Sequence, residues 1–134
     1  MSIEGRCNCG EVRFRLSEPP QDVYVCHCSI CRRATGSNGI AVTLVERDAF
    51  EWLAGHELVR TWRKPDGDYS CAFCARCGSP LPADNDPARL FVPAGLLPDD
   101  AADLRVAAHI FVDSRAAWDE IGDDGVRHPE AFGS

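Results

Sequence analysis

The sequence contains no long apolar segment. None of its hydrophobic runs approaches the roughly 20 residues that cross a bilayer, so we expect no transmembrane segment and no membrane partner. Residues 1–6 lack the apolar core of a secretory signal, and we therefore expect a cytoplasmic protein. Cytoplasmic cysteines are kept reduced, so the eight cysteines predict metal binding or catalysis rather than disulfide bonds.

Positive charge is also scarce. The 14 lysines and arginines are outnumbered by 21 aspartates and glutamates, which gives a formal net charge of −7 at pH 7. Such a chain repels phosphate backbones, and no basic tail is present, so we expect no nucleic-acid partner. No repeat and no Gly/Ser-rich linker interrupts the chain, which predicts one domain over residues 1–134.

Helical periodicity is weak, whereas short alternating apolar runs are frequent. Helical turns are expected only after Cys31, over 48–53 before Gly55, and over 114–121 with Ser114 as the cap. Strands are expected wherever apolar and polar residues alternate, over 12–16, 23–25, 40–44, 58–62, 69–73, 90–92 and 106–112. This spacing predicts a mainly β protein, a sandwich or a barrel.

Two closely spaced cysteine pairs lie far apart in the chain. We call Cys7, Cys9, Cys74 and Cys77 the four-cysteine group. A CxC pair on extended backbone directs both side chains to one face, and a CxxC pair in a tight turn does the same. Together the pairs supply the four thiolates of a structural zinc site. Disulfides at CxC spacing would be strained, and the strand–helix context of the alternative, a redox CxxC, is missing.

A second set, Cys26, Cys28 and Cys31, is called the three-cysteine group. Three protein ligands with an open position are typical of catalytic zinc, so the two groups together predict up to two zinc ions per chain. His27 is a possible fourth ligand, but between two ligating cysteines it points to the opposite face, and we expect it to pack instead. Cys71 is expected to be a small buried side chain, with closure of this group as the alternative.

With these motifs in this order, the chain resembles the glutathione-dependent formaldehyde-activating enzyme family, which includes centromere protein V. The resemblance rests on residues 5–10 (GRCNCG), 26–33 (CHCSICRR), 73–79 (FCARCGS) and 109–118 (HIFVDSRAAW). It implies a zinc-containing β-tent fold, with a structural zinc in the four-cysteine group and a catalytic zinc in the three-cysteine group. The implied reaction is that of a carbon–sulfur lyase, joining glutathione or another thiol to formaldehyde, as in S-hydroxymethylglutathione.

Zinc with an open position can lower the pKa of an incoming thiol or polarise a carbonyl oxygen. Arg32 and Arg33 directly follow the three-cysteine group and are candidates for binding substrate carboxylates, with solvated surface charge as the alternative. His109 is expected to be a satisfied, partly buried histidine. A non-catalytic zinc-stabilised binding module is the alternative function. Closure of the three-cysteine group by His27 or Cys71 would favour it, whereas an open position favours the enzyme.

Overall fold

Three β-sheets dominate the computed structural model, which describes residues 1–100 and 103–134. The first sheet has the order β1 (Ile3–Arg6), β2 (Arg13–Leu16) and β5 (Phe50–Ala54). The second has the order β12 (Val126–Arg127), β11 (Arg105–Ile110), β3 (Asp22–Cys26), β4 (Ile40–Glu46), β10 (Arg89–Pro93) and β9 (Ala83–Asp84). The third contains β6 (Val59–Arg63), β7 (Ser70–Cys74) and β8 (Pro80–Leu81). The expected mainly β architecture is confirmed.

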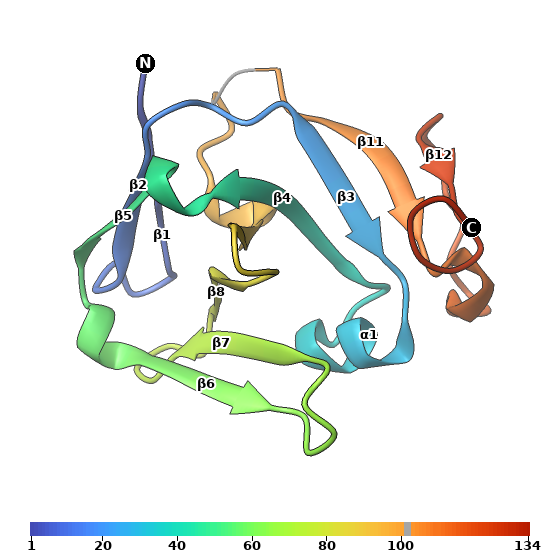
Figure 1. The fold of residues 1–134 in the computed structure, drawn as a ribbon, viewed down its shortest axis with the longest axis horizontal. Coiled ribbons are helices and arrows are strands. Elements are labelled where there is room, and N and C mark those ends of the chain that lie inside the picture. Colours follow the sequence, from blue (N-terminus) through green and yellow to red (C-terminus); the bar gives the residue numbers. More distant parts are fainter. Residues whose placement is uncertain (101–102) are drawn as a thin grey trace.

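The three sheets surround a triangular outline, with β6 and β7 along one side and β3, β4 and β11 along another (Figure 1). Neighbouring strands are antiparallel except at β11, which runs parallel to both β3 and β12. Because β3 and β11 are parallel, they end side by side, with Cys26 opposite Ile110. The single α-helix of the described residues, α1 (Ser29–Thr35), begins just beyond this point. The three-cysteine group therefore lies where two strands end and a helix begins.

An aromatic cluster fixes the first sheet. The alternation in β2 buries Phe14 and Leu16 completely, as its pattern predicts. The ring of Phe14 stacks on Phe50 with 5.4 Å between centroids and meets Trp52 edge-on at 6.3 Å. The helical turn expected over 48–53 is therefore wrong beyond Ala49. A 3-10 turn at Arg47–Ala49 leads into β5, because Phe50 and Trp52 pack on β2 and tertiary packing outweighs a weak helical signal.

The helix predicted over 114–121 is also wrong. A 3-10 turn at Val112–Ser114 is followed by turns and irregular backbone, and Phe111 has a left-handed φ of 56°. The helical turn expected at Cys31 is present as α1, which ends at Gly36 with a φ of 69°. In the part of the chain that the structure describes, no helix has the length and apolar character to span a membrane.

Gly55 should be intolerant of any side chain. It has a φ of 78°, and a Cβ would enter the backbone of Glu11, in the turn that carries the first two cysteines. Gly67 has a similar φ of 82°, but a Cβ there would meet nothing within 4 Å. Left-handed backbone costs a non-glycine residue about 1–2 kcal/mol at either position. We expect Gly55→Ala to lower the melting temperature clearly more than Gly67→Ala in circular dichroism. Equal shifts would mean that the turn containing Glu11 moves freely.

Candidate metal centres

Two glycine-ended turns carry the four-cysteine group. The turn after β1 is closed by the amide of Gly10, which donates to the carbonyl of Cys7 at 3.1 Å, with a φ of 79° at Gly10. The extended backbone predicted for this CxC pair is therefore wrong, since the chain bends between the cysteines. The turn after β7 is closed by the amide of Gly78, which donates to the carbonyl of Cys74 at 2.8 Å. The two turns bring their four sulfurs together.

The sulfur geometry of the four-cysteine group fits a tetrahedral metal. The four Sγ atoms lie within 4.8 Å of one another, with 3.5 Å between Cys7 and Cys9 and 3.9 Å between Cys9 and Cys74. A tetrahedron with 2.3 Å zinc–sulfur bonds has edges of about 3.8 Å. Cys7 and Cys74 are each 1% exposed, whereas Cys77 is half-buried and Cys9 is exposed, so one side of the group faces water. Converging thiolates repel one another unless a cation lies between them, and this donor set suits a soft divalent ion.

Hydrogen bonds favour the thiolate form of Cys77 and Cys7, whereas, despite a backbone hydrogen bond from Glu11, burial and the neighbouring thiols raise the pKa of Cys9 to about 11. The Ser79 hydroxyl accepts the amide hydrogen of Asn8 at 2.9 Å, so its own proton is free to point at the Cys77 sulfur, 3.3 Å away. The Ser79 side chain and backbone together lower the pKa of Cys77 to about 5. The amide of Val12 likewise donates to the Cys7 sulfur at 3.4 Å. Such contacts orient metal ligands and hold them ionised.

The three-cysteine group occupies the junction of β3 and α1. Cys26 ends the strand, Cys28 is the N-cap, and the Cys31 amide donates to the Cys28 sulfur at 3.3 Å. The three Sγ atoms lie within 4.8 Å of one another, and no fourth ligand atom joins them within the described residues. A hydrogen bond from Cys31 lowers the pKa of Cys26 to about 6 and raises that of Cys31 itself. The group thus has three converging sulfurs, and its hydrogen bonds favour the thiolate form of Cys26.

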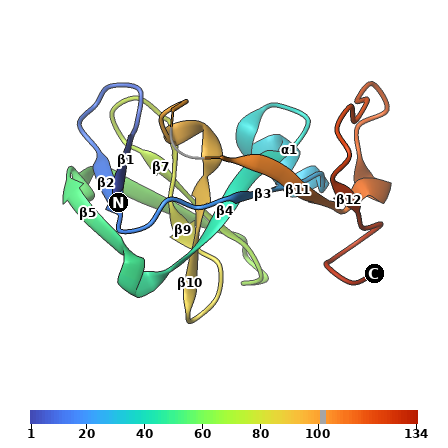
Figure 2. The same ribbon diagram turned by 90° about the horizontal axis from the view of Figure 1, so that it is seen from above.

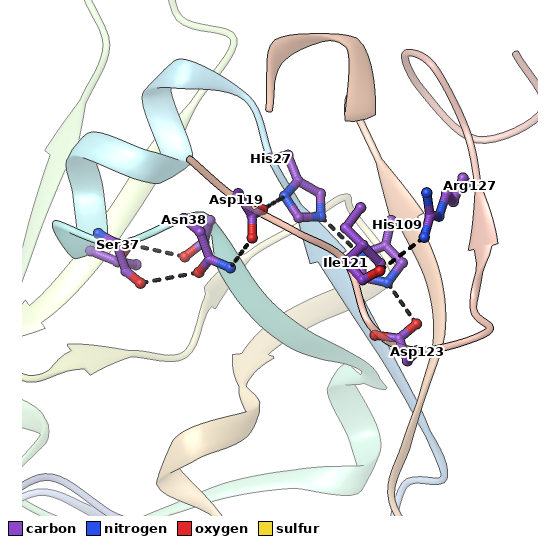
Figure 3. Close-up of polar contacts among 10 residues, drawn as sticks. His27, Ser37, Asn38, His109, Asp119, Ile121, Asp123 and Arg127 are labelled. Carbon is purple, nitrogen blue, oxygen red and sulfur yellow. Dashed lines mark hydrogen bonds and ion pairs between the residues drawn. The ribbon is translucent and has the colours of Figure 1, made fainter. Parts of the chain in front are cut away.

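Neither candidate for a fourth ligand closes this group. His27 is 1% exposed, and both of its ring nitrogens face other side chains. Nε2 lies 2.8 Å from His109 Nδ1, and Nδ1 lies 3.3 Å from Asp119 Oδ2 (Figure 3). His27 therefore packs rather than ligates in this structure, and His109 is buried and hydrogen-bonded, as expected. Cys71 lies on β7, outside both cysteine groups, with its pKa raised by burial.

The three-cysteine group opens into a cavity of about 730 Å³. The walls come from the six-stranded sheet and from the hairpin that joins β6 and β7. Apolar side chains form much of the lining, among them Tyr24, Val42, Leu44, Phe91 and Phe132. The cavity is therefore large enough for a small organic molecule, and it brings such a molecule to the sulfurs.

One hydroxyl in this lining has no partner. The Tyr69 Oη atom is buried, and it makes no hydrogen bond within the described residues. Burial raises the pKa of Tyr69, and the negative charge of nearby cysteines, Cys31 foremost, raises it further. Buried hydroxyls usually find a partner, so an unpartnered one beside the sulfurs is a donor available to a ligand. No motif in the sequence marks Tyr69, and the cavity that it lines is made by strands distant in the sequence.

The arginines of the cavity differ from those expected. Arg32 and Arg33 lie on α1, and neither is among the residues that line the cavity. Arg33 borders a separate hollow, and Arg32 Nε is buried without a hydrogen-bond partner among the described residues. The guanidinium groups in the cavity wall belong to Arg63 and Arg89. Sequence reasoning missed both, because each is more than 30 positions from the three-cysteine group.

Comparisons with known proteins assign this chain to a family. Residues 2–114 match the model of the family described as "Glutathione-dependent formaldehyde-activating enzyme". A Halomonas elongata protein named "Putative glutathione-dependent formaldehyde-activating enzyme" is 31% identical over 128 residues, which cover 90% of this chain and 82% of that protein. A crystal structure of a Rhodobacter sphaeroides protein shares the fold with a TM-score of 0.60 at 22% identity, over 72% of this chain and 89% of that one. The chain belongs to the glutathione-dependent formaldehyde-activating enzyme family.

Proposed function

We propose that this protein is a zinc-dependent carbon–sulfur lyase that acts on the adduct of a glutathione-like thiol and an aldehyde, such as S-hydroxymethylglutathione. One observation carries the proposal: three converging sulfurs, with no fourth ligand in the described part of the chain, lie at the wall of a cavity of about 730 Å³. Three ligands and access for a small molecule are the features of a catalytic rather than a structural zinc site. The family's name supports glutathione and formaldehyde as the reactants.

The alternative, a non-catalytic zinc-stabilised module, requires a closed second centre. His27 is engaged by His109 and Asp119, and Cys71 lies outside the group. These placements favour the enzyme, since a ligand position remains for a substrate atom.

The two cysteine groups would then hold zinc ions with different roles. The four-cysteine group would hold a structural zinc, and Cys26, Cys28 and Cys31 would hold the catalytic one. When bound there, zinc supplies a Lewis acid that lowers the pKa of the substrate thiol or polarises the aldehyde oxygen.

The reaction itself is an addition. The thiolate sulfur of the substrate attacks the aldehyde carbon, a carbon–sulfur bond forms, and the carbonyl π electrons move to oxygen. The resulting alkoxide takes up one proton, equal to the proton that the thiol released, and the lyase direction reverses each change. The Tyr69 hydroxyl, kept protonated by its raised pKa and free of other partners, donates a hydrogen bond to this developing alkoxide.

The cavity also offers groups for the rest of the thiol. Glutathione carries two carboxylates, and the Arg63 and Arg89 guanidinium groups in the lining are suited to bind them. The side chain of Arg89 is held in place by Asp86, with Nη2 3.0 Å from Oδ2. The geometry favours these two arginines over Arg32 and Arg33, which do not line the cavity.

The two centres should fail differently when a ligand is removed. Cys9 and Cys74 are 65 positions apart, so a metal there closes a long loop and its binding free energy is folding free energy. Cys26, Cys28 and Cys31 lie within six residues and close almost no loop. We expect Cys74→Ser to give unfolded or aggregating protein, and Cys28→Ser to melt cooperatively with one zinc fewer. Circular dichroism with elemental analysis measures both, and the reverse pattern would contradict the assigned roles.

Catalysis should depend on Tyr69. Exchange NMR spectroscopy measures the interconversion of glutathione with formaldehyde and S-hydroxymethylglutathione, and we expect zinc-loaded protein to accelerate it. Loss of one oxyanion donor lowers kcat by about 100-fold, so Tyr69→Phe should show a loss of that order with little change in KM. Tyr24 lines the same cavity, and Tyr24→Phe, which also removes one hydroxyl, is the matched control. No acceleration by the zinc-loaded parent would refute the proposed reaction, and equal losses in the two variants would refute the role of Tyr69.

A further inference from the structure

A chain of four polar side chains lies behind the three-cysteine group, buried except at Asp123. It runs from Asp119 through His27 and His109 to Asp123 (Figure 3). The Asp119–His27 contact is 3.3 Å, the contact between the histidine rings is 2.8 Å, and the His109–Asp123 contact is 2.8 Å. The two rings stack with 5.0 Å between centroids. His27, between two of the cysteines, is thus the point at which this chain reaches the metal-binding loop.

The two carboxylates come from the C-terminal segment, which follows the 3-10 turn at Val112–Ser114. This segment and β12 lie at the end of the molecule opposite the first sheet (Figure 2). The family model matches residues 2–114, so Asp119 and Asp123 lie beyond the matched region. Of the groups that face the His27 ring, His109 thus lies within the residues that the model matches and Asp119 lies outside them.

The contact between Asp119 and His27 lies between two buried side chains. The side chain of Asp119 is only 7% exposed and that of His27 only 1%. Asp119 Oδ1 also accepts a hydrogen bond from the Asn38 side-chain amide at 3.2 Å. His27 Nδ1 and Asp119 Oδ2 face each other at 3.3 Å, and neither atom makes a hydrogen bond within the described residues. Buried polar atoms without hydrogen bonds are costly, so a close polar neighbour matters to each of them. Without Asp119, the Nδ1 atom of His27 would lose the acidic group that faces it.

The backbone of the same loop is held on its other sides. The His27 amide donates to the carbonyl of Ile110 at 3.0 Å, which ties the loop to the end of β11. Gly39 packs so closely against the carbonyl of Cys26 that a Cβ there would overlap it. The side chain of His27 provides a further attachment of the loop, through its contacts with Asp119 and His109.

We propose that Asp119 is a positioning residue, which orients the Cys26–Cys28 backbone through His27 and thereby sets the metal affinity of the three-cysteine group. The inference rests on the metal-binding role of that group in the proposed function. It extends the functional unit beyond the family-matched region into the C-terminal segment. Groups that orient metal ligands from behind change metal affinity by about 10- to 100-fold when they are removed.

The test is cobalt titration of the full-length protein against a competing chelator, followed through the sulfur-to-cobalt absorption bands. We expect Asp119→Ala to lower the affinity of one of the two sites by about 10- to 100-fold and to leave the other unchanged. Asp119→Asn keeps an oxygen toward His27 and should recover part of the loss. Asp124→Asn alters an exposed carboxylate in the same segment and should match the parent.

The Cys28→Ser background identifies the affected site, because there Asp119→Ala should leave the affinity of the remaining site unchanged. Equal loss at both sites of the otherwise native protein would indicate general destabilisation and would overturn the proposal, as would two unchanged affinities. The readout needs no enzymatic turnover. A weakened second site in a protein without lyase activity would uphold the positioning role and refute the proposed reaction. A parent that binds only one ion would overturn both.

Discussion

Convergence of four sulfur atoms is the constraint on which the rest of the molecule depends. One pair lies in the turn between β1 and β2, and the other follows β7 in the turn that leads to β8, so the group fastens the first sheet to the third. Around it pack the buried side chains of Val12, Leu81, Ala72 and Ala83, with larger, partly buried side chains such as Trp52 and Phe91 outside them. Ionised sulfurs held this close repel one another. A cation that neutralises them would turn this repulsion into a link between the two sheets.

The three-cysteine group depends on the fold in a different way. Its sulfurs are local in sequence, so holding them together requires little of the fold, and the metal would add little to global stability. The fold instead sets the direction in which the side chains of this group point. Parallel β3 and β11 end at the same edge, α1 begins there, and the sulfurs point into the cavity while His27 points away from it. One face of the loop therefore borders the cavity, and the other face packs against the protein interior.

The sequence predicted the parts of this arrangement that depend on local pattern. Alternation located the strands around Phe14 and Val42, and cysteine spacing separated the two groups. Period-two geometry placed His27 behind the sulfurs. Local pattern failed over 48–53 and 114–121, where contacts to distant residues decide the backbone: aromatic packing on β2 in one case, the Asp119–His27 pair in the other.

The side chains that we propose to act in the cavity were beyond such reasoning. Tyr69, Arg63 and Arg89 have no motif of their own, and they line the same cavity as the sulfurs only because the β6–β7 hairpin faces the six-stranded sheet. Asp119 also carries no recognisable sequence signal, since an acidic residue in an irregular segment ordinarily indicates exposed surface. Its burial follows from the position of the C-terminal segment, which is a property of the whole fold.

X-ray absorption at the zinc edge tests the central claim most directly, because it counts sulfur ligands per metal. The protein loaded with two zinc ions should show an average between three and four sulfurs at about 2.3 Å, with the remainder made up by a lighter atom. Cys28→Ser, carrying one zinc, should show four. Four sulfurs per zinc in the doubly loaded protein would mean that both centres are closed, and that would contradict an open site for thiol and aldehyde.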